Sequence, residues 1–311
     1  MMSDPSAPAD FHLHFEGCLF PATLDALGGT GSAAALALKR GNGLAGFLAC
    51  LRGQLMLLKT DAAFARAFDG FRDYLHEQNL ARAEVFFSPL IYDRIGYSAT
   101  AALEILAARW SELPAQTILI FDTVRQFGPG AAEKVVALAA DWRERLPIAG
   151  LGMGGDEDAY PAREFRTAYD EARKLGLGLT CHAGEAGSAR NIWEAIDELG
   201  VTRIGHGLAA ADDSALMERM RRDDIAIECC PESNLALGLV ESLPLHPLHI
   251  FIREKLALLP GADDPAVFGA DSRAEFARLA ARIPADRLAA AMASHAFTRR
   301  EPFGGPTNRP A

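Results

Sequence analysis

Seven side chains with acid–base or metal-binding chemistry stand at the ends of short apolar segments of the sequence. Four of them are histidines, one is a glutamate and two are adjacent aspartates: His12, His14, His182, His206, Glu185, Asp263 and Asp264. Imidazole nitrogens and carboxylate oxygens bind zinc in catalytic sites, and the same groups act as general acids and bases. The set is therefore the inventory of a hydrolase that uses one metal ion.

His12 and His14 are two positions apart in an apolar run, so on a β-strand both imidazoles would lie on the same face. His182 ends another apolar segment and could supply a third nitrogen, while Asp263 could supply an oxygen. Three histidines and one carboxylate leave a coordination position open for water, as a catalytic zinc site requires. By itself His12-Leu13-His14 is a weak signal, and the other ligands make the metal hypothesis specific.

The three remaining side chains each have a chemical and a structural interpretation. Glu185, three residues after His182, could be a general acid in a closed apolar pocket, or a first-turn carboxylate of the next helix. His206 lies between two glycines and could be a ligand, a base, an electrostatic stabiliser or a core histidine. Asp264 could act on the attacking water, or it could only belong to a turn before a helix.

Elements that could position these residues follow from the alternation of apolar runs with amphipathic stretches. The candidate strands are Phe11–Phe15, Ala83–Ser88, Thr117–Phe121, Ile148–Met153, Gly178–His182, Thr202–His206, Ile225–Cys229 and Lys255–Leu259. The stretches with helical spacing are Ala99–Trp110, Ala131–Arg145, Pro161–Leu175, Ser188–Leu199 and Asp212–Arg222. Eight strands alternating with helices predict an α/β fold, a (β/α)8 TIM-type barrel, in which ligands come from the ends of different strands. A doubly wound open sheet is the alternative, although no GxGxxG motif follows the first strand.

The domain organisation expected from the sequence is one metal-dependent hydrolase barrel over residues 11–300. Residues 1–10 are predicted to form a disordered arm, and residues 301–311, with three prolines and two glycines, a flexible tail.

A helical insertion is expected at about residues 16–82, because the segment before Ala83 is far longer than one crossover helix. Gly28–Gly31 and Gly41–Gly46 are predicted to break it, and Leu51–Leu58 and Ala62–Leu75 to be helical. An insertion at this place either forms a lid over the pocket or packs on the flank of the barrel.

The composition argues against several classes of binding partner. A net charge of −10 argues against nucleic acid, which needs a basic surface. No apolar run approaches the roughly 20 residues that span a bilayer, and the N-terminus lacks a signal peptide. Five cysteines with no CxxC pair favour reduced thiols and a cytoplasmic protein. Nothing in the sequence specifies an oligomeric state.

Six motifs together resemble the adenosine deaminase family of the amidohydrolase superfamily, in family order. They are His12-Leu13-His14-Phe15-Glu16-Gly17, Met153-Gly154-Gly155-Asp156-Glu157, His182-Ala183-Gly184-Glu185, Arg203-Ile204-Gly205-His206-Gly207, Cys230-Pro231-Glu232-Ser233-Asn234 and Asp263-Asp264-Pro265. The resemblance runs from residue 11 to about residue 270. It implies one zinc ion held by His12, His14, His182 and Asp263.

The resemblance also implies roles for the other residues. Asp264 and His206 would orient and deprotonate the attacking water, and Glu185 would protonate the purine ring nitrogen beside the reacting carbon. Gly155 would donate its backbone N–H to the purine, and Glu16 would contact the substrate. His14 and Asp264 are expected to contact the substrate as well.

The implied reaction is hydrolytic deamination of a 6-aminopurine, giving the 6-oxo product and ammonia. Two substrate signals conflict: Glu16 is more typical of the adenine deaminase branch, whereas Gly154-Gly155-Asp156-Glu157 and Arg203-Ile204-Gly205-His206 resemble the nucleoside branch. We expect a nucleoside-like substrate, adenosine or a modified adenosine such as aminodeoxyfutalosine, with free adenine as the alternative. Another mononuclear hydrolase or a non-catalytic purine-binding protein on the same fold are further alternatives. The unrelated zinc deaminases with H-x-E and P-C-x-x-C motifs are excluded by spacing.

Overall fold

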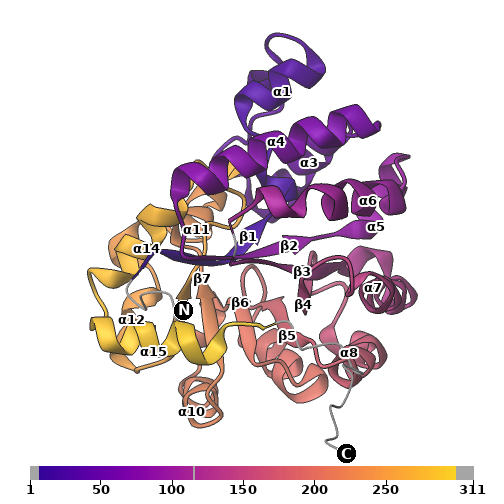
Figure 1. Ribbon diagram of the computed structural model, residues 1–311. Helices are drawn as coiled ribbons and strands as arrows, with labels where there is room; N and C mark the ends of the chain where they lie inside the picture. The colour runs from indigo at the N-terminus through magenta and orange to yellow at the C-terminus, as the bar shows by residue number, and fades with distance from the viewer. Residues whose placement is uncertain (1–6, 115, 299–311) are drawn as a thin grey trace, which may run out of the picture.

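The computed structural model describes residues 7–114 and 116–298, and its centre is a sheet of eight parallel strands paired in sequence order (Figure 1). The strands are β1 (Ala9–His14), β2 (Arg82–Phe87), β3 (Thr117–Val124), β4 (Ile148–Gly154), β5 (Gly178–Ala183), β6 (Arg203–His206), β7 (Ala226–Cys229) and β8 (Leu258–Pro260). A parallel bridge between Leu13 and Asp263 joins β1 to the segment just after β8. The sheet is thus a nearly closed (β/α)8 barrel, and the open doubly wound alternative is wrong.

Helices surround the barrel and connect successive strands (Figure 1). Their bounds are α1 (Pro21–Gly28), α2 (Ser32–Ala35), α3 (Gly43–Leu55), α4 (Asp61–Gln78), α5 (Pro89–Ile95), α6 (Ala99–Arg109), α7 (Pro129–Trp142), α8 (Arg166–Lys174), α9 (Ala189–Glu194), α10 (Ser214–Arg222), α11 (Pro231–Leu237), α12 (Leu248–Arg253), α13 (Pro265–Phe268), α14 (Ser272–Ala280) and α15 (Ala285–His295). No helix within residues 7–114 and 116–298 is long and apolar enough to cross a membrane. The five cysteines are free thiols.

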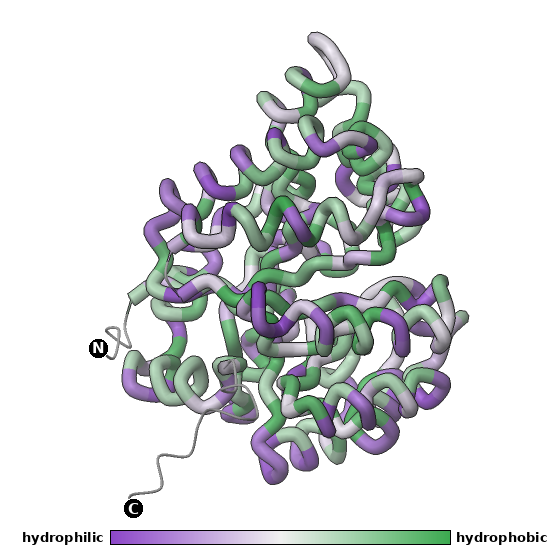
Figure 2. The backbone as a smooth tube through the Cα atoms, turned by 45° about the vertical axis from the view of Figure 1, so that its right-hand side comes forward, coloured by the Kyte–Doolittle hydropathy of each residue, from purple (hydrophilic) through white to green (hydrophobic). Residues whose placement is uncertain are grey.

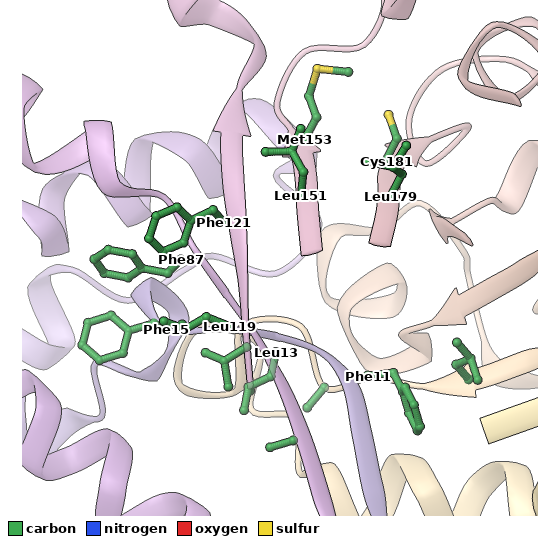
Figure 3. Close-up of a cluster of buried hydrophobic side chains, with 14 of the residues drawn as sticks. Phe11, Leu13, Phe15, Phe87, Leu119, Phe121, Leu151, Met153, Leu179 and Cys181 are labelled. Carbon is green, nitrogen blue, oxygen red and sulfur yellow. The ribbon is translucent and has the colours of Figure 1, made fainter. Parts of the chain in front are cut away.

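The strands carry an apolar face toward the helices, because alternate residues of a strand point to opposite sides. Phe11, Leu13 and Phe15 belong to the main hydrophobic cluster, which Figure 3 shows together with Phe87 and Phe121 of the neighbouring strands. The intervening His12 and His14 are thereby left for the barrel interior. In Figure 2 hydrophobic residues run through the central strands, whereas many hydrophilic ones lie on the peripheral helices.

Two predicted boundaries need correction. Strand β1 begins at Ala9, so residues 9 and 10 are not part of a disordered arm: Ala9 pairs with Arg82 and Asp10 is buried. Residues 1–6 and the predicted tail at 301–311 lie outside the described residues. Strand β8 begins three residues later than predicted, because Lys255 has a φ of +60° in the turn that ends α12.

The segment at residues 16–82 contains helices in two different positions. Helix α3 reaches the mouth of the barrel, where Phe47 packs against Phe268. Helix α4 lies on the outer side, where Phe64 packs against Phe15 and Phe87 of the barrel strands. The predicted break at Gly41–Gly46 is wrong in part, since Gly43 begins α3 and the packing of Phe47 outweighs the low helix propensity of glycine.

Candidate active site

The four predicted metal ligands meet at the carboxyl ends of β1, β5 and β8. The Nε2 atom of His12 lies 2.9 Å from that of His182 and 3.2 Å from that of His14, and His14 and His182 are 3.3 Å apart. Asp263 Oδ1 lies 3.6 Å from His14 Nε2 and 3.8 Å from His12 Nε2. Ligand atoms about 2.0–2.1 Å from one tetrahedral ion stand about 3.3 Å apart, so the four atoms have the spacing of a zinc site.

Hydrogen bonds at the outer ring nitrogens orient two of these histidines toward each other. His12 Nδ1 lies 2.5 Å from a carboxylate oxygen of Glu228, and His182 Nδ1 lies 3.0 Å from the carbonyl oxygen of Met153. Both partners only accept hydrogen bonds, so each Nδ1 carries a proton and each Nε2 is directed into the cluster. The two Nε2 atoms thus converge on the position that a metal ion would occupy.

The charge states of the cluster also suit a metal. Burial lowers the pKa of His14 to about 3 and that of His182 well below its ordinary value, so both imidazoles are neutral. Burial works against ionisation of Asp263, but the adjacent rings of His206 and His12 hold the pKa of its carboxyl below the usual range. Neutral imidazoles with one carboxylate are the protonation states that coordination requires.

Behind His12 a buried chain of charges fixes the ring. Glu228 accepts hydrogen bonds from Arg203 Nε at 2.6 Å and from Thr180 Oγ1 at 2.8 Å, in addition to His12. Arg203 in turn donates to Glu84 at 2.6 Å, and both residues are fully buried. A carboxylate behind a ligating imidazole fixes its tautomer and raises its basicity, which strengthens metal binding.

A cavity of about 100 Å³ opens directly above the ligand cluster. All of the predicted site residues except His12 line it, and His12 lies beneath, among the ligands. The remaining wall comes from α3, Ser88, Ile91, Asp122, Val124, Gly154 and Phe268. The predicted residues are therefore brought to one place, and the helix from the insertion covers them with Leu44, Phe47, Leu48 and Leu51.

Glu185 lies in the loop after β5, with its carboxyl at the cavity and only 9% of its side chain exposed. Burial raises the pKa of this carboxyl to about 7, while His206 opposes the rise and Asp263 adds to it. A carboxyl with this pKa is about half protonated at pH 7, so a large fraction of the protein holds a proton that Glu185 can donate. The first-turn alternative does not describe its position, because α9 begins only at Ala189.

Glu157 holds the loop that carries Glu185. Its carboxylate accepts hydrogen bonds from the backbone N–H groups of Gly184 at 2.5 Å, Glu185 at 3.0 Å, Ala186 at 3.0 Å and Gly187 at 2.8 Å. Glu157 belongs to the motif Met153-Gly154-Gly155-Asp156-Glu157, but nothing in the sequence indicates this contact. Without this buried carboxylate, the four loop N–H groups would have no hydrogen-bond acceptor.

Replacement of Glu157 by alanine is expected to lower the free energy of unfolding by at least about 3 kcal/mol, because charge-assisted hydrogen bonds contribute about 1.5–3 kcal/mol each. It should also lower kcat, since Glu185 loses its position. Urea unfolding and steady-state kinetics measure the two effects. The exposed neighbour Asp158 is the matched control: Asp158→Ala should change stability by less than about 0.5 kcal/mol. Equal effects of the two substitutions would contradict this role.

His206 and Asp264 complete the wall around the ligands. His206 Nε2 lies 3.7 Å from Glu185 Oε1 and 3.8 Å from Asp263 Oδ2. Asp264 is the residue before α13, and its Oδ1 is a buried oxygen without a hydrogen-bond partner among the described residues. His206 and Asp263 both have left-handed backbone conformations, with φ of +61° and +63°, a strain that occurs mostly at functional sites.

Two positions near the cavity must be glycine, because other side chains approach their backbone closely. A Cβ atom on Gly17 would lie 2.1 Å from Asp264 Oδ1, so the turn after β1 can pass the carboxyl only without a side chain. Gly155 has a φ of +110°, and its Cβ would lie 2.1 Å from Gln126 Oε1. Gly155 lines the cavity, as expected for a backbone that contacts the substrate.

Glu16 is part of an acidic wall that sequence reasoning identified only in part. Its Oε1 accepts hydrogen bonds from Ser88 N at 3.0 Å and Tyr92 OH at 3.3 Å, and Ser88 Oγ donates to Asp122 Oδ2 at 3.1 Å. Burial raises the pKa of Glu16 to about 7 and that of Asp122 to about 8. Glu16 Oε2 and Asp122 Oδ1 have no hydrogen-bond partner among the described residues. Asp122 had one available signal, a lone carboxyl near the end of an apolar strand.

Known proteins resemble the chain over most of its length. The sequence model of the adenosine deaminase family matches residues 8–291. An adenine deaminase from Chelativorans sp. is 31% identical, covering 86% of this chain and 85% of its own. An adenosine deaminase from Edwardsiella ictaluri is 36% identical, covering 76% of this chain and 72% of its own.

Solved structures agree with these relatives. The crystal structure of an adenine deaminase from Arthrobacter aurescens superposes with a TM-score of 0.79 at 26% identity, covering 94% of each chain. An N6-mAMP deaminase from Arabidopsis, at 21% identity, shares the fold with a TM-score of 0.82 over 94% of each chain. With a matching family model over nearly the whole chain and relatives above 30% identity, this metal-dependent hydrolytic deaminase belongs to the adenosine deaminase family.

Proposed function

We propose that the protein is a zinc-dependent deaminase of a nucleoside-like 6-aminopurine, which it converts to the 6-oxo purine and ammonia. The observation that carries this proposal is the placement of Glu185, His206 and Asp264 around one cavity, directly above the His12, His14, His182 and Asp263 cluster. Bound there, zinc would supply Lewis-acid polarisation and lower the pKa of water toward neutrality.

The residues of the chain carry out the remaining steps around the purine. Asp264 and His206 orient and deprotonate the attacking water on the metal side. Glu185 donates its proton to the ring nitrogen beside C6, which makes that carbon electrophilic. Gly155 directs its backbone N–H to the opposite edge of the purine. Water adds to C6 and gives one proton to the protein, which passes it to the amino group. The C6–N bond then breaks, ammonia leaves, and the hydroxyl proton returns to Glu185 as the 6-oxo group forms.

The acidic wall favours a nucleoside-like substrate. Glu16 and Asp122 line the cavity, each has one oxygen without a hydrogen-bond partner among the described residues, and a ribose-like group offers hydroxyls to both. Free adenine is the second candidate, and two observations support it. The relatives include adenine deaminases, and the cavity of about 100 Å³ is smaller than the roughly 150 Å³ cavity that holds a benzene ring. A nucleoside would therefore require a larger displacement of α3 than a free base.

The test is turnover of adenine, adenosine, deoxyadenosine, methylthioadenosine and aminodeoxyfutalosine, measured by ammonia release and the change in purine absorbance. Turnover of none of these compounds would refute the proposal, and the highest kcat/KM with adenine would favour the second candidate.

Asp122→Asn separates the two candidates further. Loss of a hydrogen bond to a carboxyl is expected to lower kcat/KM for nucleosides about 10–100-fold, because such a bond contributes about 1.5–3 kcal/mol. Activity on adenine, which lacks the hydroxyls, should fall much less. The exposed Asp141 of α7 gives the control Asp141→Asn, which should leave both activities unchanged. A uniform loss on every substrate would contradict a contact between Asp122 and the sugar.

A further inference from the structure

A buried relay of hydrogen bonds connects His206 to His246, a residue that the sequence motifs do not include. Asn234 of α11 lies between the two rings: its Nδ2 is 3.1 Å from His206 Nδ1, and its Oδ1 is 3.1 Å from His246 Nε2. On the far side, the backbone N–H of Leu248 donates to His246 Nδ1 at 2.9 Å. His206, Asn234 and His246 are each at most 2% exposed, so water does not compete for these bonds.

The backbone N–H of Leu248 determines the direction of every bond in the relay. A backbone N–H can only donate, so His246 Nδ1 must be the acceptor and the proton of this neutral ring must be on Nε2. His246 Nε2–H then requires an acceptor, which makes the facing atom of Asn234 its oxygen. The amide NH₂ of Asn234 therefore faces His206 and donates to Nδ1. The remaining proton of His206 is on Nε2.

Rotation of the Asn234 amide by 180° does not provide an alternative. The NH₂ group would then face His246 and require a lone pair on Nε2. That tautomer of His246 carries its proton on Nδ1, where it would meet the N–H of Leu248 at 2.9 Å. Burial lowers the pKa of His246 to about 4, so the doubly protonated ring is not available at neutral pH either.

We propose that His246 is a positioning residue that acts through Asn234 to hold His206 in the Nε2–H tautomer, with its N–H directed at the reaction site. The surroundings of His206 Nε2 agree, because a carboxylate oxygen of Asp263 lies 3.8 Å away. An N–H directed at this carboxylate is favourable, whereas a lone pair there would be repelled.

The inference rests on the proposed function and changes the role of one residue in it. A neutral His206 with its proton on Nε2 is a hydrogen-bond donor to the attacking oxygen and cannot take a proton at the same atom. Removal of the proton from water then falls to a group other than His206. The role expected for His206 from the family resemblance, orientation and deprotonation, is thus reduced to orientation.

The tautomer can be read directly by ¹⁵N NMR of histidine-labelled, metal-loaded protein without substrate. We expect His206 protonated on Nε2 in the wild type and on Nδ1 in Asn234→Asp, because a carboxylate accepts from both rings. Nδ1 protonation in the wild type would overturn the inference. Since no turnover is needed, a protein that deaminates no tested purine but has the Nε2–H tautomer would refute the proposed function and leave the relay intact.

Kinetics test whether the tautomer matters. His246→Ala should lower kcat about 10–100-fold with KM and metal content nearly unchanged, as for groups that orient active-site histidines. His246→Gln keeps an N–H donor toward Asn234 and should recover most of the loss. His249, exposed on α12 just after His246, gives the control His249→Ala, expected to be fully active. Equal losses in His246→Gln and His246→Ala, or full activity of Asn234→Asp, would overturn the role.

Discussion

Replacement of Glu185 by glutamine is expected to lower kcat by about 10²–10⁴-fold, the range contributed by a positioned general acid. The carboxyl lies in the cavity above the ligand cluster, and burial raises its pKa to about 7, so it carries a proton that glutamine cannot supply. Glutamine is nearly isosteric and retains an amide donor, so substrate binding should change little. In free energy the loss corresponds to about 3–5.5 kcal/mol of transition-state stabilisation.

The measurement is steady-state kinetics with metal content determined on the same preparation. Full metal occupancy in Glu185→Gln, together with a large loss of kcat, would assign the effect to proton donation. Unchanged turnover in an active, metal-loaded preparation would refute the mechanism. Glu194, near the surface of α9, gives a matched control, because Glu194→Gln removes a carboxyl from an ion pair with Arg163 far from the cavity lining.

The same carboxyl predicts how the rate depends on pH. Only the protonated form of Glu185 can donate, so kcat/KM should fall as pH rises through its pKa, which burial raises to about 7. The Glu185→Gln variant should lose this alkaline limb, because the amide does not titrate.

The positions of the site residues could be predicted because the carboxyl ends of all strands of a (β/α)8 barrel lie at the same face of the barrel. Each strand is short and apolar, and a polar residue at its carboxyl end must emerge at the same face as the others. His12 and His182 are on β1 and β5, far apart in the chain, and their Nε2 atoms are 2.9 Å apart. Period-two alternation within β1 was sufficient to place His14 beside His12.

Residues whose roles depend on tertiary partners could not be found in this way. Glu157 is important because four loop amides donate to its carboxylate, and His246 because Asn234 of α11 lies between it and His206. Neither contact has a spacing rule, since the partners come from different segments of the chain. Asp122 follows the strand-end rule and was missed only because its neighbours in sequence carry no motif.

Prediction from helix propensity also failed where tertiary packing outweighs it. Gly43 and Gly46 lie in α3, whose residue Phe47 is held by Phe268 and α11 at the mouth of the barrel. A glycine costs roughly 1 kcal/mol in a helix, less than burial of a phenylalanine contributes. The glycine-rich pattern therefore predicted a break where the structure has the helix that covers the substrate cavity.

Loss of the metal ligands should have the largest effect of any change in the chain. The double substitution His12→Ala/His14→Ala removes two of three nitrogen ligands, and kcat is expected to fall by more than about 10⁴-fold, because both the Lewis acid and the activated water are lost. Metal analysis should show occupancy near zero. Stoichiometric metal in the double variant would refute the assignment of these ligands.

The stability of the double variant separates a metal site from an ordinary buried histidine cluster. Zinc should raise the Tm of the wild type, because a ligand that binds only the folded state stabilises it by RT ln(1 + [L]/Kd). It should leave the Tm of the variant unchanged.

His76 provides the matched control for this experiment, since it is exposed on α4 and its ring is hydrogen-bonded to the carbonyl oxygen of Glu112. His76→Ala should keep the zinc-dependent rise in Tm and the full activity. If the double variant and the control responded alike to zinc, the ion would bind elsewhere. If only the double variant loses both the rise in Tm and turnover, the histidine cluster that Glu228 and Met153 orient is the metal site.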